Sequence, residues 1–201
     1  MEYNAFGDYT QVNQPAHLPS IVYTRGLAGP FDYTPGIFNL EMDGYKGPDE
    51  EVLSTLGKQL DAYVVVYAPI QMVADIPESY RLPSGAYHPA MPYLREMATD
   101  WDATYPISGE LGEYAVVARK VRGEDRYFVG GVNGETDRDV SILLDFLPSG
   151  KTYTMTLYRD GADAHYRDNK TALEIETRKV TSATRVDVRM ATAGGFGAVI
   201  E

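Results

Sequence analysis

Residues 31–38, FDYTPGIF, are the stretch from which the fold of this chain is predicted. A short apolar approach ends in a carboxylate, Asp32, and an aromatic ring, Tyr33, and the Pro-Gly pair that follows stops any regular element. A strand of a (β/α)8 barrel delivers side chains in this way to the loop face where ligands bind. The stretch therefore predicts one edge of a ligand-binding face, which reaches back along the chain to Glu2.

The sequence on either side of this stretch predicts a loop and a long helix. Residues 2–19 are mostly polar and contain a glycine and two prolines, which is typical of a loop. After a linker at residues 44–48, the acidic run 49–51 suits the first turn of a helix, where the helix dipole favours negative charge. Apolar side chains then recur at steps of three and four: Val52, Leu56, Leu60, Tyr63 and Tyr67. We expect a helix over residues 52–73, kinked at Pro69 and ended at residues 75–77, and a short helix at residues 93–98.

From about residue 110 onward the hydrophobic period changes. Strand-like runs alternate with turn signals such as Asn133-Gly134 and Asp160-Gly161, and no helical pattern intervenes. The expected strands are residues 113–121, 126–132, 140–147, 152–159, 173–180, 185–190 and 197–200. Such spacing indicates an antiparallel β-sandwich. The predicted fold is α/β followed by all-β, divided into residues 1–103 and 104–201, with Trp101 packing the two parts together.

Composition restricts the function. The chain has 201 residues, 44% of them hydrophobic, and a net charge of -11, which argues against a nucleic-acid surface because phosphate binding needs a basic patch. The absence of cysteine excludes disulfides, thiolate metal sites and cysteine nucleophiles. No apolar run is long enough for a membrane span, and the N-terminus lacks the layout of a signal peptide.

Six long segments, taken together, resemble a known family. They are MEYNAFG (1–7), YTRGLAGPFDYTPGIF (23–38), LGKQLDAYVVVYAPIQMVADIPESY (56–80), WDATYPISGELGEYAVVARK (101–120), LDFLPSGKTYTMTLYRDG (144–161) and AGGFGAVI (193–200). In this order they resemble the C-terminal part of a family 97 glycoside hydrolase, the group of α-glucosidases and α-galactosidases. The resemblance implies the last units of a (β/α)8 barrel followed by a C-terminal antiparallel β-sandwich.

The resemblance also assigns residues. It implies that Glu2 is the general acid and lies at a calcium site, so calcium is the expected cofactor and oligosaccharides are the expected substrates. The second catalytic carboxylate and most calcium ligands are expected before Met1, so the chain is expected to be an incomplete piece that does not turn over glycosides alone. The family also implies a periplasmic or other extracytoplasmic location for the parent enzyme.

Other residues of the first part are candidates for substrate binding. Asp32, Tyr33 and His17 are expected in the pocket, although Asp32 equally fits a turn-forming carboxylate that bonds its own backbone. Arg25 is expected to have a structural role, paired with an acid. Three scattered histidines have no metal-ligand spacing, so no zinc site is predicted.

Two classes of function stay open at this stage. The first is an α-glycosidase, with ligand bound around residues 2–38. The second is a noncatalytic protein, either a carbohydrate-binding β-sandwich or an inactive remnant, with ligand bound after residue 106. A partial barrel should expose the apolar surface of the helix at residues 52–73, so self-association of the chain is also expected.

Overall fold

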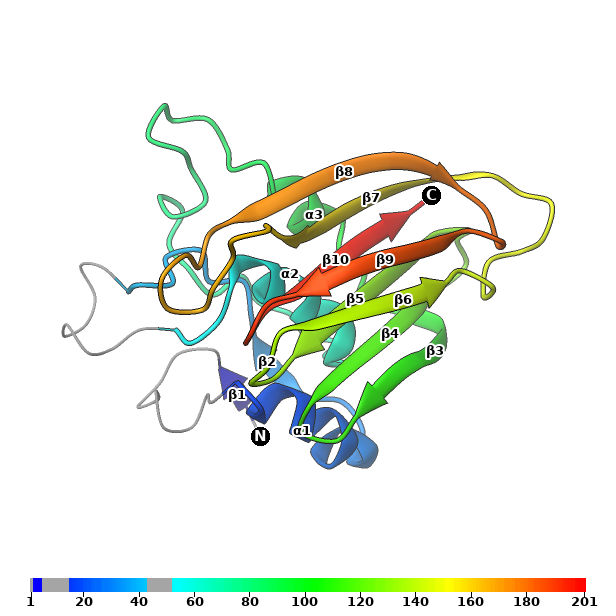
Figure 1. Ribbon diagram of the computed structural model, residues 1–201, viewed down its shortest axis with the longest axis horizontal. Helices are drawn as coiled ribbons and strands as arrows, with labels where there is room; N and C mark the ends of the chain where they lie inside the picture. Colours follow the sequence, from blue (N-terminus) through cyan, green and yellow to red (C-terminus); the bar gives the residue numbers. More distant parts are fainter. Residues whose placement is uncertain (1, 5–14, 43–51) are drawn as a thin grey trace.

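The computed structural model describes residues 2–4, 15–42 and 52–201 (Figure 1). Most of this structure is antiparallel β-sheet formed by the second half of the chain. Its strands are β3 (Trp101–Glu110), β4 (Tyr114–Val121), β5 (Tyr127–Asn133), β6 (Arg138–Leu143), β7 (Tyr153–Asp160), β8 (Leu173–Val180), β9 (Arg185–Met190) and β10 (Gly195–Ile200). The seven predicted strands are confirmed, with ends shifted by a few residues. The sequence did not predict β3.

The strands form two sheets that share one core. Six of them follow the order β3-β4-β5-β10-β7-β8, and β6 and β9 pair as a separate antiparallel ribbon that lies over the larger sheet (Figure 1). Phe128 and Val199 point to one face of the large sheet, while Val129, Ala198 and Ile200 point to the face that the ribbon covers. Successive side chains of a strand therefore pack into two different apolar clusters, one on each face of the large sheet.

The first part of the chain is smaller and mixed. It contains β1 (Glu2–Asn4), α1 (His17–Tyr23), a 3-10 helix η1 (Arg25–Ala28), β2 (Asp32–Thr34), α2 (Leu56–Val65) and α3 (Met91–Glu96). β1 and β2 pair in parallel. The described residues form no closed barrel, and this short parallel pair lies where barrel units were expected. Residues 2–4 and 17–19, which were expected in a loop, belong to β1 and α1. The short helix predicted at 93–98 is confirmed two residues earlier.

A segment after α2 runs beside β2 in the same direction. The Phe31 amide donates to the Tyr67 carbonyl at 2.7 Å, and the Ala74 amide donates to the Pro35 carbonyl at 3.1 Å. The first bond joins residue 31 to residue 67 and the second joins residue 35 to residue 74, so the residue numbers rise in the same direction on both sides. Residues 67–74 therefore run parallel to β2 and lie beside it. Because α2 connects them, the arrangement has the order of a β-α-β unit.

The prediction of a helix over residues 52–73 is wrong in length. α2 begins at Leu56, where the Thr55 side chain caps it by accepting from the Lys58 amide at 3.2 Å, and it ends at Val65. Val66 already has an extended backbone. The apolar spacing beyond it belongs to a non-helical segment, residues 67–74, and coincides with a helical period by chance. The acidic run 49–51 lies outside the described residues.

All ten residues of α2 are buried, so the expectation of an exposed apolar surface is wrong for residues 56–65, whereas Ile70, Met72 and Val73 further along the expected helix are exposed. One side of α2 packs on β5 and β10 of the large sheet. Glycines in these strands permit the close approach, since a Cβ at Gly130 would lie 2.8 Å from the Val64 Cβ. The opposite side packs on Ile37 and Leu40 after β2. The sandwich thus covers a helix that was expected to need missing strands.

Buried polar groups fix the N-terminal end of α2 to the sandwich. The Thr55 hydroxyl donates to Asp160 Oδ1 at 2.6 Å, and Lys58 Nζ donates to the Asn133 carbonyl at 2.9 Å. Burial lowers the pKa of Lys58 to about 8 and raises the pKa of Asp160 to about 6. Burial also raises the pKa of Asp61, whose carboxylate lies beneath Gly195 of β10. Helix and sandwich are therefore joined by specific polar contacts as well as by apolar packing.

Trp101 packs at the junction, as expected. Its ring is buried and lies edge-on to Phe128 at 5.7 Å, in one apolar cluster with Leu56 and Tyr93. The division of the chain at residues 103 and 104 stays a prediction, and β3 begins slightly before it. Among the helices of residues 15–42 and 52–201, none is long and apolar enough to cross a membrane.

Candidate functional site

The parallel pair β1–β2 brings together two predicted site residues. In its register Glu2 lies opposite Asp32, Tyr3 opposite Tyr33 and Asn4 opposite Thr34. Neighbouring strands are about 4.8 Å apart. Asp32 is exposed. Two acidic residues that are 30 positions apart in sequence are therefore neighbours on two short parallel strands, and their roles in a binding face stay predictions.

The Pro35-Gly36 loop after β2 is held by polar side chains of α2. Gln59 Oε1 accepts from the Gly36 and Ile37 amides, each at 3.2 Å. The Tyr63 hydroxyl bonds the Pro35 carbonyl at 3.1 Å. Gly36 has φ +86°, and a Cβ there would overlap the Tyr63 hydroxyl, so only glycine fits this turn.

A second set of contacts holds the next part of the same loop. Asp75 Oδ2 accepts from the Phe38 and Asn39 amides at 2.9 and 2.8 Å. The Tyr80 hydroxyl donates to the Gly36 carbonyl at 2.9 Å and accepts from the Asp75 amide at the same distance. Residues 35–39 are thus held by side chains from both α2 and residues 75–80, which fixes the chain that follows β2.

Sequence reasoning missed these positioning residues. Gln59 and Tyr63 are polar side chains four residues apart, and so on one face of α2, and that spacing was the available signal. Asp75 was interpreted only as part of a helix end. Its partners lie 36 and 37 positions earlier in the chain, and no local pattern shows such a contact.

His17 begins α1 and is half buried. Burial and the positive charge of Lys58 lower its pKa, so its imidazole is neutral at pH 7. Lys58 Nζ donates to the Pro15 carbonyl at 2.9 Å, which fixes the chain just before α1. The structure therefore places His17 near the N-terminal end of α2, at the junction with the sandwich. Its role in binding substrate stays a prediction.

Among the residues that the structure describes, Arg25 contacts two carbonyls and an aromatic ring, which is a structural role. Its guanidinium donates to the carbonyls of Gly29 and Pro30 at 3.1 and 3.0 Å and lies 4.7 Å from the centre of the Phe31 ring. These contacts hold η1 against the start of β2.

The metal prediction rests on Glu2. Within residues 2–4, 15–42 and 52–201, no group of three or more His, Asp or Glu side chains is placed to hold a metal ion. Ca²⁺ takes six to eight oxygen ligands. Carboxylate donors such as Glu2 suit calcium, but the described residues do not supply a full set, and the calcium site stays a prediction.

Comparison with known proteins gives a consistent match. A family model described as "Glycosyl-hydrolase 97 C-terminal, oligomerisation" matches residues 100–201. The retaining alpha-galactosidase of Bacteroides thetaiotaomicron is 33% identical over 196 residues, which is 94% of this chain and 28% of that protein. The probable retaining alpha-galactosidase of Streptomyces bingchenggensis is 31% identical, over 96% of this chain and 27% of that protein. The chain thus spans under a third of the length of these relatives.

Solved structures agree. A glycoside hydrolase family 97 enzyme from Pseudoalteromonas sp. strain K8, in complex with acarbose, has a TM-score of 0.87 and 36% identity over 94% of this chain and 29% of the enzyme. A beta-arabinopyranosidase, at 23% identity and a TM-score of 0.72, shares the fold. The matched region, the identity and the fold together show that this chain belongs to glycosyl hydrolase family 97 and that residues 100–201 are its C-terminal domain.

Proposed function

We propose that this chain contributes to the hydrolysis of α-glycosidic bonds in oligosaccharides, as the C-terminal part of a family 97 α-glycosidase. The register that sets Glu2 beside Asp32 is the observation that supports the proposal, because it brings two acidic residues onto adjacent parallel strands. The retaining alpha-galactosidases among the relatives favour α-galactosides as substrates.

In this proposal Glu2 is the general acid and protonates the leaving oxygen. Asp32 and Tyr33, from the adjacent strand, contact the sugar, and the loop of residues 35–39 keeps that strand in place. Glycoside hydrolysis needs a second carboxylate, as base or nucleophile. The partner carboxylate lies outside the described residues, so the isolated chain does not turn over glycosides.

The order β1-β2-(67–74) also bears on the architecture of the complete enzyme. The three segments are parallel and α2 connects the last two, as in successive units of a (β/α)8 barrel. Ile70 is 71% exposed and Val73 51% exposed, so the outer edge of residues 67–74 has apolar side chains without cover. We propose that these segments are barrel units completed by the rest of the enzyme, and that Glu2 is one of the calcium ligands there.

The test uses a chimera in which this chain replaces the matching C-terminal 28% of the Bacteroides thetaiotaomicron enzyme. The chimera should hydrolyse both melibiose, which has a poor alkyl leaving group, and 4-nitrophenyl α-galactoside, whose leaving group departs without a proton. Glu2→Gln should lower the rate on melibiose by about 10³-fold and the rate on the aryl galactoside much less, because general acid catalysis contributes about 10²–10⁴-fold.

The matched control is Asp168→Asn, at a side chain that is 86% exposed in the sandwich. Thermal melting of each variant shows whether it folds. Equal losses on both substrates, or full melibiose activity of a folded Glu2→Gln chimera, would show that Glu2 is not the acid. Steady turnover by the isolated chain would contradict the need for a second carboxylate from outside it. Calorimetric titration of the chimera with calcium, with and without the Glu2→Gln substitution, tests whether this substitution weakens metal binding.

A further inference from the structure

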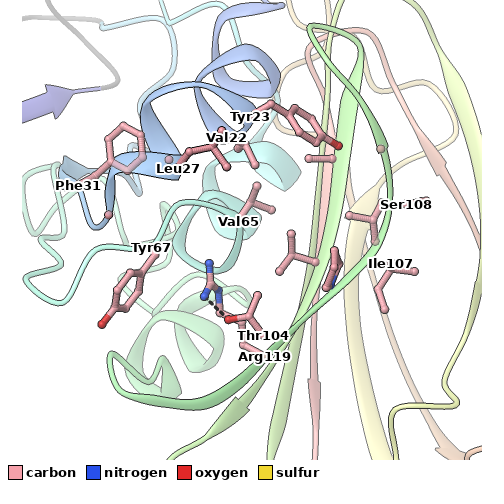
Figure 2. A pocket seen from close by; sticks show the side chains of 17 residues that line it. Val22, Tyr23, Leu27, Phe31, Val65, Tyr67, Thr104, Ile107, Ser108 and Arg119 are labelled. Atoms are coloured by element: carbon pink, nitrogen blue, oxygen red, sulfur yellow. Dashed lines mark hydrogen bonds between the residues drawn. The ribbon is translucent and has the colours of Figure 1, made fainter.

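An apolar groove lies between the helical side of the chain and the edge of the sandwich (Figure 2). Its volume is about 510 Å³, and its walls come from α1, η1 and the end of α2 on one side and from β3 and β4 on the other. We call it the α1–β3 groove and define it by six of its lining residues: Val22, Leu27, Phe31, Val65, Ile107 and Val117. Cavities that take small molecules have volumes of about 300–1,000 Å³, are mainly apolar and often lie where two parts of a protein meet.

One positive charge lies in the wall of this groove. Arg119, on β4, is only 8% exposed, and Figure 2 shows its guanidinium between Tyr67 and Thr104. Its Nε donates to the Val64 carbonyl at 2.6 Å, and its Nη1 donates to Thr104 Oγ1 at 2.7 Å. The guanidinium carbon lies 5.4 Å from the centre of the Tyr67 ring and 5.9 Å from that of Trp101. These contacts give the charge a fixed position in the groove.

No acidic side chain neutralises this charge within the part of the chain that the structure describes. None of the described lining residues is an aspartate or a glutamate. Burial lowers the pKa of Arg119 to about 10, and the effect that opposes burial comes from Tyr67, not from a carboxylate. A buried charge without a counter-charge is costly. The groove therefore combines apolar walls with a cation that has no acidic partner among the described residues.

Contacts within the chain account for only part of what Arg119 can bind. The Val64 carbonyl lies at the C-terminal end of α2, where the partial negative charge of the helix favours a cation. The two hydrogen bonds use two of the five N–H groups of the guanidinium. A carboxylate would accept from the remaining donors and supply the full negative charge that a helix end lacks.

The charge of the whole molecule restricts which anions can bind. The chain has a net charge of -11, so its surface repels anions in general. An anion gains at the groove because Arg119 is near and the lining acids are absent, and it gains more if an apolar body covers the walls. A ligand that uses both features has one carboxylate joined to an apolar group.

We propose that the α1–β3 groove binds a small organic monoanion, with its carboxylate on Arg119 and its apolar body between Phe31 and Ile107. These two side chains lie on opposite walls in Figure 2. Glu2 and Asp32 are not among the lining residues, so the site is separate from the proposed catalytic face and does not rest on the proposed function.

Calorimetric titration of the chain with 4-phenylbutyrate tests the site. Saturable binding is expected. The matched amide, 4-phenylbutanamide, has the same shape without the charge, and acetate has the charge without the apolar body. Each should bind at least about tenfold more weakly than 4-phenylbutyrate, because each lacks one of the two interactions. The fluorescence of Trp101, the only tryptophan of the sequence, should change with the same dissociation constant, since its ring lies beside Arg119.

A substitution that gives Arg119 an acidic partner tests where the carboxylate binds. Thr104 is exposed and already contacts Nη1, so Thr104→Asp should pair with Arg119 and weaken 4-phenylbutyrate binding at least about tenfold. Thr177→Asp is the matched control, because it adds the same charge at an exposed threonine of β8 outside the groove. It should change the dissociation constant less than about threefold. Thermal melting shows whether both variants fold.

Several results would overturn the proposal. They are the absence of saturable binding to the wild-type chain, equal affinity for the carboxylate and its amide, and equal weakening by folded Thr104→Asp and Thr177→Asp. The chimera described above adds one more. If the isolated chain binds 4-phenylbutyrate and the folded chimera does not, the rest of the enzyme covers the groove, and the site does not serve a small molecule. None of these outcomes depends on glycosidase activity.

Discussion

The Thr55 hydroxyl donates a 2.6 Å hydrogen bond to Asp160, 105 positions further along the chain, and so joins the first turn of α2 to the end of β7. The same oxygen accepts from the Lys58 amide and caps the helix. The carboxylate of Asp160 also accepts from the Ala191 and Gly195 amides. One buried contact therefore stabilises the helix, the turn before β10 and the attachment of the two parts.

Thr55→Val should lower the free energy of unfolding by about 2 kcal/mol, because it removes the cap and leaves a buried carboxylate short of one donor. Thr55→Ser should keep most of the stability. Urea unfolding followed by circular dichroism gives both values. Thr177→Val, at an exposed threonine on β8, is the control and should stay within about 0.5 kcal/mol of wild type. If Thr55→Val and Thr177→Val lowered the free energy of unfolding by similar amounts, the hydrogen bond from Thr55 to Asp160 would not contribute measurably to stability.

The stability of the chain should depend on the ionisation of Asp160. Burial raises its pKa from 3.8 to about 6. Because the folded value lies above the unfolded one, the contribution of this group is fully present below pH 4 and is lost as the pH rises through 6. The difference corresponds to about 3 kcal/mol. In Asp160→Asn the free energy of unfolding should lack this fall between pH 4 and 6. Parallel pH profiles of the two proteins would refute the shifted pKa.

Gly36→Ala should disturb the loop after β2. The residue has φ +86°, and the added Cβ would overlap the Tyr63 hydroxyl, so we expect a loss of at least about 2 kcal/mol. Gly85→Ala separates the two causes, because Gly85 has φ +83° with nothing within 4 Å of a Cβ. That control should lose only about 1 kcal/mol from backbone strain. Thermal melts that rank the two variants equally would show that the Tyr63 contact is not tight.

Asp75→Ala should loosen residues 38 and 39 without unfolding the sandwich. Both amides donate to Asp75 Oδ2, and the substitution leaves them without this acceptor. Hydrogen exchange at the Phe38 and Asn39 amides should become at least about tenfold faster, while exchange in β5 and β10 stays at the wild-type rate. Asp168→Ala, at a side chain that is 86% exposed, serves as the control. Unchanged protection at residues 38 and 39 would remove Asp75 from the set of positioning residues.

The sandwich was predictable because its strands are short, regular and separated by turn signals. Val116, Ala118, Val129 and Ala198 follow the alternation of a buried sheet, and Asn133-Gly134 marks a chain reversal. β3 escaped prediction because Pro106 and Gly109 interrupt its pattern, and proline is tolerated there only because β3 is an edge strand.

The first part of the chain was less predictable because its contacts are long-range. The helix was extended past Val65 since Tyr67 and Val73 continue an apolar spacing that in fact belongs to a segment beside β2. The structure pairs Glu2 with Asp32, and their roles in binding stay predictions, whereas the role of Asp75 follows from backbone contacts that no sequence pattern displays.

The position of β10 has a consequence for how the molecule forms. This strand comes last in the described sequence, yet it lies between β5 and β7 in the middle of the large sheet and provides a surface on which α2 packs. During synthesis on the ribosome, α2 emerges about 130 residues before β10 does, and its buried Lys58 and Asp61 have no complete surface to receive them. The surface on which α2 packs is therefore complete only after residues 195–200 have been synthesised.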